Sequence, residues 1–285
     1  MEAPELKLPI SDLSCCADLY ALPLVRALLG DSLHPGGLAL TRAVVKPLEL
    51  SKNHHLLDVA CGPGASALML AQVYKCRVTG VDVDASAIRA ARQEARRYRL
   101  HGLVNFIEAD AARLPFASSQ FDATLCECAS NLLENRQAAL LEMARVLRPG
   151  GYLALTDVTF RPDKLPDSLD HPLAKMLCVP LGQGPEDLAD DIEQAGLQVQ
   201  DKRDYSSFIT EFLNKLGAFF NSPLTTVDKQ DSSGTPDPIT AALGCARKLV
   251  EEGSLGYWGF TARKGRFANP PLSFCGSGNS TLNSL

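Results

Sequence analysis

The 285 residues contain no apolar run that approaches the roughly 18 residues a membrane-spanning helix needs. Basic residues are not in excess, because 28 Lys and Arg stand against 33 Asp and Glu, for a net charge of -5. The first residues, MEAPELKLPISDL, lack the basic start and the apolar run of a secretory signal. We therefore expect a cytoplasmic protein that binds neither a membrane nor nucleic acid.

The nine cysteines lack the regular spacing of a disulfide framework or of a closed zinc site. Their number is odd, and neither Cys15 with Cys16 nor Cys126 with Cys128 forms a CxxC pair. In a cytoplasmic protein unbridged thiols are the usual state. We therefore predict no disulfide framework and no closed metal site, and a less regular thiolate site stays open.

Hydrophobic periodicity changes along the chain. Between residues 14 and 50 apolar residues recur at helical spacing, which predicts a helical region. From 51 to 160 short apolar runs alternate with helical segments, and this alternation is typical of a doubly wound, mostly parallel sheet. The last strand of this region, YLALTDVTF, follows a helix that we expect to end at the Pro-Gly-Gly of residues 149–151.

The remaining segments extend this core. LGYWGFTARKG predicts a closing strand, in which Tyr257 and Trp258 pack against the sheet. The stretch 221–238 is rich in turn-forming residues, and we expect a loop there. The predicted fold is α/β and Rossmann-like, with four regions: an N-terminal helical lid at 1–50, a cofactor-binding core at 51–160, an acceptor-pocket extension with the closing strand at 161–264, and a flexible tail at 265–285.

The sharpest motif is LDVACGPGA at residues 57–65, between a predicted strand and a predicted helix. Its glycines let the backbone approach a ligand closely, and the first helical turn offers unpaired N–H groups. The next strand ends at Asp82, where an acid can accept hydrogen bonds from ribose hydroxyls. The third strand ends in EADA at 108–111, which can present a carboxylate to an adenine amino group, and RVLRPGGYL at 145–153 precedes the fifth strand.

In their order and spacing these four elements resemble those of the class I S-adenosylmethionine-dependent methyltransferases, over residues 55–160. One departure is Ala60, which stands where that family often has its first glycine. The resemblance implies S-adenosylmethionine as the cofactor. From the methionine end to the adenine end, it implies binding by Asp58, Gly62, Gly64, Asp82, Asp110 and Ala111.

A nicotinamide-dependent oxidoreductase would also use a glycine-rich loop and a ribose-binding acid. The loop in this chain lacks the third glycine of G-x-G-x-x-G, because Ala67 stands at that offset. Asp110 and the Pro-Gly-Gly element have no particular place in a dinucleotide site, whereas both are expected of a methyltransferase. They favour the methyltransferase interpretation.

The segment CECASNL at 126–132 resembles the S-N-C-x-x-N-L segment of the arsenite methyltransferases, with Cys128 on the cysteine and Asn131 on the asparagine. The segment CVPLG at 178–182 resembles a second, cysteine-led segment of that branch. This resemblance implies a metalloid acceptor such as arsenite, with Cys128 and Cys178 as the catalytic thiols. Thiolates are soft ligands suited to a thiophilic metalloid.

The sequence departs from the arsenite methyltransferases at the position of one further cysteine. That branch has a cysteine before the glycine-rich loop, near the position where this chain reads DSLHPGG at residues 31–37. Cys15 and Cys16 lie nearby in the sequence and are candidates to replace it.

Two other functions stay open at this point. One is methylation of a small organic metabolite, such as a quinol, phenol or thiol, with Glu127 or His34 as the general base. The other is a non-catalytic cofactor-binding or metal-sensing protein. Cysteines also pack as small buried hydrophobic residues, which is the competing interpretation of Cys126. The sequence gives no indication of the oligomeric state.

Overall fold

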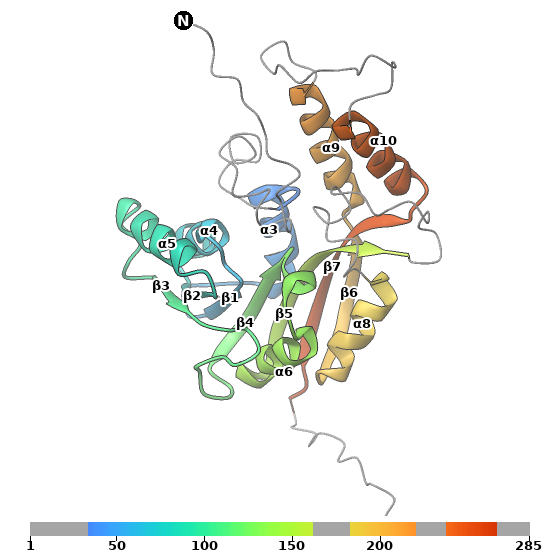
Figure 1. The fold of residues 1–285 in the computed structure, drawn as a ribbon. Coiled ribbons are helices and arrows are strands. Elements are labelled where there is room, and N and C mark those ends of the chain that lie inside the picture. Colours follow the sequence, from blue (N-terminus) through green and yellow to red (C-terminus); the bar gives the residue numbers. More distant parts are fainter. Residues whose placement is uncertain (1–33, 162–182, 221–237, 267–285) are drawn as a thin grey trace, which may run out of the picture.

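The computed structural model describes residues 34–161, 183–220 and 238–266, which form a seven-stranded sheet flanked by helices (Figure 1). The strand order is β3-β2-β1-β4-β5-β7-β6. The five parallel strands are β1 (His55–Val59), β2 (Arg77–Asp82), β3 (Val104–Glu108), β4 (Phe121–Glu127) and β5 (Leu147–Phe160). β7 (Leu255–Lys264) runs antiparallel between β5 and β6 (Leu197–Asp204). The predicted Rossmann-like, mostly parallel fold is therefore confirmed.

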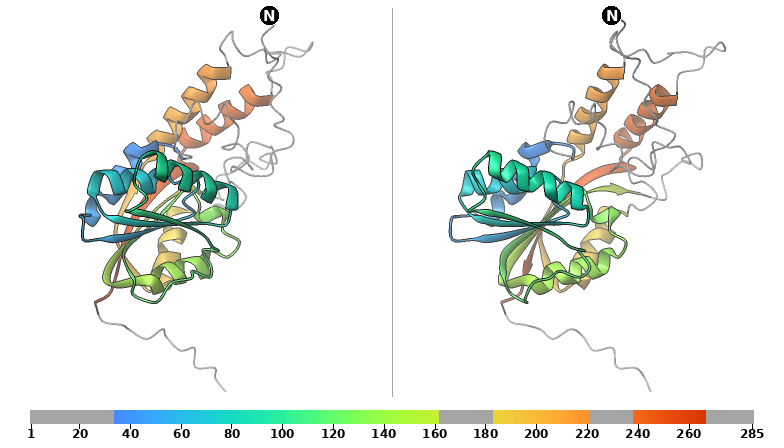
Figure 2. Two further views of the ribbon diagram at one scale, coloured as in Figure 1. Left: turned by 90° about the vertical axis from the view of Figure 1, so that its left-hand side faces the viewer. Right: turned by 60° about the vertical axis from the view of Figure 1, so that its left-hand side comes forward.

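Helices cover both faces of the sheet, as the two views of Figure 2 show. One face carries α3 (Gly37–Val45), α4 (Ala65–Tyr74), α5 (Ala85–Arg97), α9 (Ser206–Phe220) and α10 (Pro238–Glu251). The other face carries α6 (Arg136–Val146) and α8 (Pro185–Gln194). Successive residues of a strand therefore enter different cores: Leu56 packs with the first group of helices, and Leu57 packs with the second.

The C-terminal helices rise beyond one end of the sheet. Figure 1 shows α9 and α10 side by side above the end where β4 finishes. Arg247 of α10 donates a hydrogen bond to the carbonyl oxygen of Leu213 in α9, at 3.2 Å. The carboxyl ends of parallel strands are where ligands bind in open α/β sheets. This helical pair therefore adjoins the edge at which a ligand is expected.

Several predicted elements are present with shifted bounds or lie outside the described ranges. Within 14–50, the described part holds α3 and a 3-10 turn at Lys46–Leu48, and residues 14–33 lie outside it. Of the predicted loop at 221–238, all but the last residue lies outside the described ranges, as does 267–285 of the predicted tail. Tyr257 is fully buried in the sheet, as expected. Within the described ranges, no helix combines the length and the apolar character needed to cross a membrane.

The prediction that the fourth core helix ends at the Pro-Gly-Gly of residues 149–151 is wrong. α6 ends at Val146, and the Pro-Gly-Gly lies inside β5. Lys264, from the end of β7, donates to the carbonyl oxygens of Ala144 and Leu147, both at 2.7 Å. This lysine therefore caps the helix. The glycines instead fit an irregularity between β4 and β5, where Gly150 has a φ of 80°.

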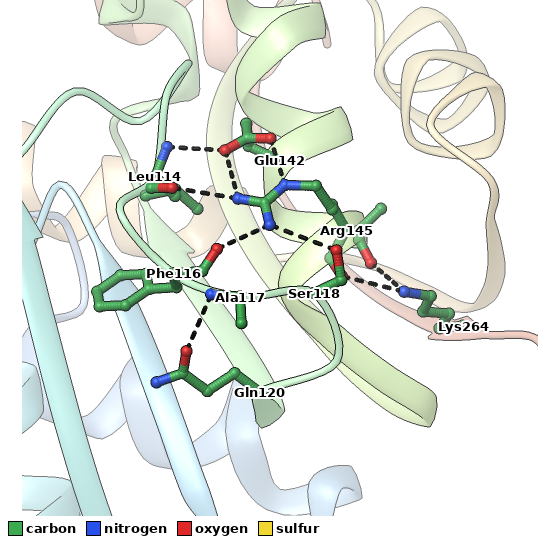
Figure 3. Close-up of polar contacts among 9 residues, drawn as sticks. Leu114, Phe116, Ala117, Ser118, Gln120, Glu142, Arg145 and Lys264 are labelled. Carbon is green, nitrogen blue, oxygen red and sulfur yellow. Dashed lines mark hydrogen bonds and ion pairs between the residues drawn. The ribbon is translucent and has the colours of Figure 1, made fainter.

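The loop that follows β3 is fastened to α6 by Arg145 (Figure 3). Its guanidinium binds both carboxylate oxygens of Glu142, at 2.6 and 2.8 Å. It also donates to the carbonyl oxygens of Leu114 and Phe116, at 3.1 and 2.8 Å. These contacts hold down the loop in which Asp110 lies. They give a structural reason for the arginine of the RVLRPGGYL element.

Replacing Arg145 with lysine tests this anchor. Arg145→Lys keeps the charge but loses the planar fork, and we expect a loss of about 1–3 kcal/mol in the free energy of unfolding, measured by urea titration. The matched control is Arg148→Lys, because Arg148 is exposed and forms a single ion pair, with Asp122. The control should stay within about 0.5 kcal/mol of the parent. Equal losses in both variants would contradict the anchoring role.

Candidate active site

The loop between β1 and α4 depends on backbone conformations that favour glycine. Gly62 and Gly64 have φ angles of 53° and 82°. A Cβ added at Gly64 would lie 2.6 Å from Phe106 Cζ, so a side chain there would collide with the ring. Ala60 also has a positive φ, 57°, although it is not glycine. A left-handed backbone typically costs a residue with a Cβ about 1–2 kcal/mol, and a glycine at this position would avoid that cost.

Asp82 ties this loop to the end of β2. One carboxylate oxygen accepts the backbone N–H of Gly62 at 2.8 Å, and the other accepts that of Asp84 at 2.9 Å. The following residue, Val83, is 68% exposed, an unusual position for a large apolar side chain next to a glycine-rich loop. Sequence reasoning did not single out Val83. The only signal for it was an apolar residue that directly follows the acid at the strand end.

The third predicted element lies beside this edge. β3 pairs with β2 so that Asp82 is opposite Glu108. Two residues further on, exposed Asp110 accepts a hydrogen bond from the backbone N–H of Ala112 at 2.8 Å, and Ala111 is buried. The structure thus brings Gly62, Asp82 and Asp110 to one end of the sheet, in the order that the sequence predicts.

Asp58 is a buried carboxyl group beneath the loop. Its side chain is 3% exposed, and within the described residues its Oδ2 atom has no hydrogen-bond partner. Burial raises the pKa of Asp58 well above its ordinary value, and the nearby carboxylates of Glu127 and Asp82 raise it further. A hydrogen bond from the backbone of Ala67 offsets part of this increase. In the absence of a cationic ligand, the site favours the neutral acid.

Glu127, at the end of β4, gathers side chains from three other parts of the chain. Its Oε2 atom accepts hydrogen bonds from Ser66 at 2.6 Å and from Thr41 at 3.1 Å. His34 Nε2 lies 3.6 Å from the same oxygen. The other oxygen, Oε1, is buried and has no partner among the described residues. Sequence reasoning named Glu127 and His34 as separate candidate bases, but it missed Thr41 and Ser66.

A cavity adjoins His34. It is lined by the HPGG segment at 34–37 and by one face of α9, including Phe208, Phe212 and the charged pair Glu211 and Lys215. Its wall is therefore partly aromatic and partly polar. Such a lining suits a small organic molecule. His34 lines this cavity, and Glu127 does not.

The cysteines do not converge within the described ranges. Cys128 follows β4 with a φ of 51°, and its backbone N–H donates to the carbonyl oxygen of Thr156 at 2.7 Å. Cys126 is fully buried on the opposite face of the sheet, as its packing interpretation requires, and burial raises the pKa of its thiol well above its ordinary value. Cys178, Cys15 and Cys16 lie outside the described residues. Among the residues described, no group of three or more His, Cys, Asp or Glu could hold a metal ion.

Asn131, the residue matched to the conserved asparagine of the arsenite branch, has a structural contact. Its side-chain amide donates to Asp157 at 3.1 Å and to the carbonyl oxygen of Val158 at 2.7 Å. Ser130 donates to the same carboxylate at 2.6 Å. This buried network fixes the turn after β4, and with it the position of Cys128.

Comparison with known proteins agrees with this geometry. A family model described as a methyltransferase domain matches residues 57–155. O-methyltransferase cnsE of Penicillium expansum is 36% identical over 169 residues, which cover 59% of this chain and 60% of that protein. The 27-O-demethylrifamycin SV methyltransferase of Amycolatopsis mediterranei is 30% identical over 229 residues, which cover 79% of this chain and 82% of that protein.

Among solved structures, the [4+2]-cyclase SpnF superposes with a TM-score of 0.64 and 28% identity, covering 83% of this chain and 84% of that one. The chain thus spans about 60% of the length of one curated relative and most of the other. The identity to the second relative extends well beyond the region that the family model matches. With the glycine-rich loop and the acids at the ends of β2 and β3, these matches show that the chain belongs to the class I S-adenosylmethionine-dependent methyltransferases.

Proposed function

We propose that the protein transfers a methyl group from S-adenosylmethionine to a hydroxyl oxygen of a small organic metabolite. The observation that carries this proposal is that His34 both lines the partly aromatic cavity and lies 3.6 Å from the buried carboxylate of Glu127. A hydroxyl acceptor must lose a proton when it is methylated, and a histidine beside a carboxylate can take it. The names of the curated relatives as O-methyltransferases support the same acceptor class.

The residues around the loop fit the cofactor. A side chain at Gly64 would collide with Phe106, so the loop presents only backbone to a ligand at this position. Asp58 presents a buried oxygen that has no hydrogen-bond partner among the described residues. Asp58, Gly62 and Gly64 would hold the methionine end, Asp82 the ribose, and Asp110 with Ala111 the adenine. The exposed side chain of Val83 would add an apolar surface for the adenine ring. When bound, S-adenosylmethionine supplies a methyl group activated by its positive sulfur.

The tautomer of His34 follows from its hydrogen bonds. Its Nδ1 atom lies 3.2 Å from the carbonyl oxygen of Pro35, so Nδ1 carries a hydrogen. Nε2 is then the nitrogen that carries no hydrogen, and because it is buried beside Glu127, the acceptor hydroxyl would have to reach it there to give up its proton. Glu127 Oε2, 3.6 Å away, stabilises the imidazolium that forms. The O–CH3 bond would form as the S–CH3 bond of the cofactor breaks, with its electron pair left on the sulfur, and the hydroxyl proton would move to His34.

Arsenite as the acceptor stays a prediction. Cys128 lies at the correct strand end for that role, but Cys178, its expected partner thiol, lies outside the described residues. The organic acceptor is favoured because a hydroxyl requires a base, and His34 with Glu127 offers one. A thiol-bound metalloid with a free lone pair would need no such base. The predicted lid at 1–50 and the extension at 161–264 would both contribute to the acceptor pocket, through His34 and α9.

The first test is a methylation assay with labelled S-adenosylmethionine and separate panels of hydroxylated metabolites, small thiols and arsenite. We expect transfer to a hydroxyl, and we expect His34→Asn to lower kcat by about 100-fold or more while cofactor affinity stays within twofold. His101→Asn, at an exposed turn, is the matched control and should leave kcat unchanged. Transfer only to arsenite, lost in Cys128→Ala, would overturn the proposal. Cofactor binding with no transfer to any acceptor would instead support a non-catalytic protein.

The second test uses the raised pKa of Asp58. A carboxyl group whose pKa is raised by folding stabilises the fold at low pH, and this contribution is lost as the pH rises through the folded-state pKa. Asp58→Asn removes this titration, so the ligand-free variant should be more stable than the parent at pH 7 by on the order of 1 kcal/mol. The gain should shrink toward pH 4, while S-adenosylmethionine should stabilise the variant less than the parent.

Urea unfolding between pH 4 and pH 8, with and without cofactor, provides the measurement. Asp190→Asn is the matched control, because Asp190 is exposed on α8, and its stability should follow that of the parent at every pH. If Asp58→Asn were less stable than the parent throughout the range, Asp58 would be serving the fold rather than the ligand.

A further inference from the structure

The cavity beside His34 has both buried and exposed walls. His34 and Phe212, which line it, are only 6% and 4% exposed. The side chains of Glu211 and Lys215, which also line it, are 57% and 55% exposed. A ligand that fills this cavity therefore has a buried part near the histidine and a part that meets two charged side chains.

The helix α9 sets the distance between these two parts. Phe208 lies against the HPGG segment, because a Cβ on Gly36 would lie 2.9 Å from Phe208 Cγ. Phe212 and Lys215 follow on the same face of α9, at the spacing of successive helical turns. Lys215 lies seven residues beyond Phe208, which is about 10 Å along a helix. The two phenylalanines therefore offer an aromatic wall that suits a flat apolar body between His34 and Lys215.

Glu211 and Lys215 form an ion pair across one turn of α9, with Lys215 Nζ 2.7 Å from Glu211 Oε1. The pair holds the ammonium group at the cavity. An ammonium group carries three N–H donors, so Lys215 can donate to Glu211 and to a ligand oxygen at the same time.

The charges of this pair limit the ligand group that can bind there. A carboxylate on the ligand would be attracted by Lys215 but repelled by Glu211, and a cationic group would be repelled by Lys215. A carbonyl oxygen carries no net charge and accepts N–H donors, so it avoids both repulsions. The pair therefore favours an uncharged oxygen over either kind of ion.

We propose that Lys215 binds a carbonyl oxygen of the methyl acceptor, at the end of the molecule remote from the methylated hydroxyl, and that Glu211 rejects acceptors with a carboxylate there. This inference rests on the proposed function, because it places the acceptor in the cavity beside His34. The acceptor class is then a hydroxylated aromatic compound with a ketone, ester or amide group. Lys215 and Glu211 determine specificity through binding, whereas His34 acts in proton removal.

The test compares equilibrium dissociation constants of the full chain for three probes that share a hydroxylated naphthalene body. 6-Hydroxy-2-acetonaphthone carries a ketone opposite the hydroxyl, 6-hydroxy-2-naphthoate carries a carboxylate there, and 2-naphthol carries neither. We expect the ketone to bind at least about fivefold more tightly than 2-naphthol, because it gains a hydrogen bond from a charged donor. The carboxylate should bind no more tightly than 2-naphthol.

Two substitutions at the pair should change the preference in different ways. Lys215→Met keeps a long apolar side chain but removes the donor, so the ketone should lose its advantage while the affinity for 2-naphthol stays within about twofold of the parent. Glu211→Gln removes the repelling charge, so the carboxylate should bind at least about fivefold more tightly than it binds the parent. A general change in the cavity would move all three constants together.

The matched controls are Lys248→Met and Glu252→Gln. These two residues form an ion pair of the same spacing, at 3.7 Å, near the end of the neighbouring helix α10, and they do not line the cavity. Neither control should change any of the three dissociation constants. Thermal unfolding without ligand establishes that each variant is folded.

The outcomes separate this inference from the proposed function. Equal affinities of the parent for the ketone and for 2-naphthol, or binding of neither, would overturn the inference. A ketone preference that persists in Lys215→Met would also overturn it, because the oxygen would then be bound elsewhere. None of these results bears on the proposed function, which fails only if the methylation assay shows no transfer to a hydroxyl group.

Discussion

The parallel register between β1 and β4 is the constraint on which the site depends. The chain builds β1, β2 and β3 outward in one direction and then returns to place β4 on the other side of β1. The strand order therefore reverses between β1 and β4, and open α/β sheets bind ligands at the carboxyl ends of the strands at such a point. The same register sets Asp58 beside Leu125, and so brings Glu127 under the loop of Gly62 and Gly64. A slip of one residue would turn Glu127 to the face that holds Cys126.

Burying Asp58 and Glu127 side by side opposes folding, and the surrounding residues offset only part of that cost. Hydroxyl groups of α3 and α4 hold one oxygen of Glu127, and the backbone of Ala67 holds Asp58. Each carboxyl retains an oxygen without a partner. A protein selected for stability alone would fill this space with apolar side chains, because an unpaired buried acid is destabilising. A bound ligand that completes the hydrogen bonding of both acids would explain their presence. The ligand-free fold is then less stable, and the ligand binds more tightly.

The features that were predicted best from the sequence are those that short stretches of the chain determine. Strand and helix alternation, the glycine-rich loop and the acids at the ends of β2 and β3 each depend on neighbouring residues, and the structure contains all of them. The predicted end of α6 was wrong because the residue that caps this helix is Lys264, more than a hundred residues away along the chain. The cluster around Glu127 was missed for the same reason: Thr41 and Ser66 are separated from it by 86 and 61 positions. Period-two alternation, in contrast, could have separated Cys126 from Glu127 in advance.

The identity of the acceptor depends on which chemistry needs the groups that the fold holds in place. Displacement at an activated methyl group requires alignment with the nucleophile, and a soft nucleophile needs no base. A hydroxyl group is different, because it gains nucleophilic strength only as its proton leaves. Side chains from two distant segments, His34 with Thr41 and Ser66, meet at Glu127, and a histidine beside a carboxylate is an arrangement suited to proton transfer. Cys128 occupies the same end of β4, but the contacts that fix its turn, from Asn131 and Ser130 to Asp157, serve the backbone. If His34 takes the acceptor proton, as proposed, this arrangement favours oxygen over a thiol-bound metalloid as the methyl acceptor.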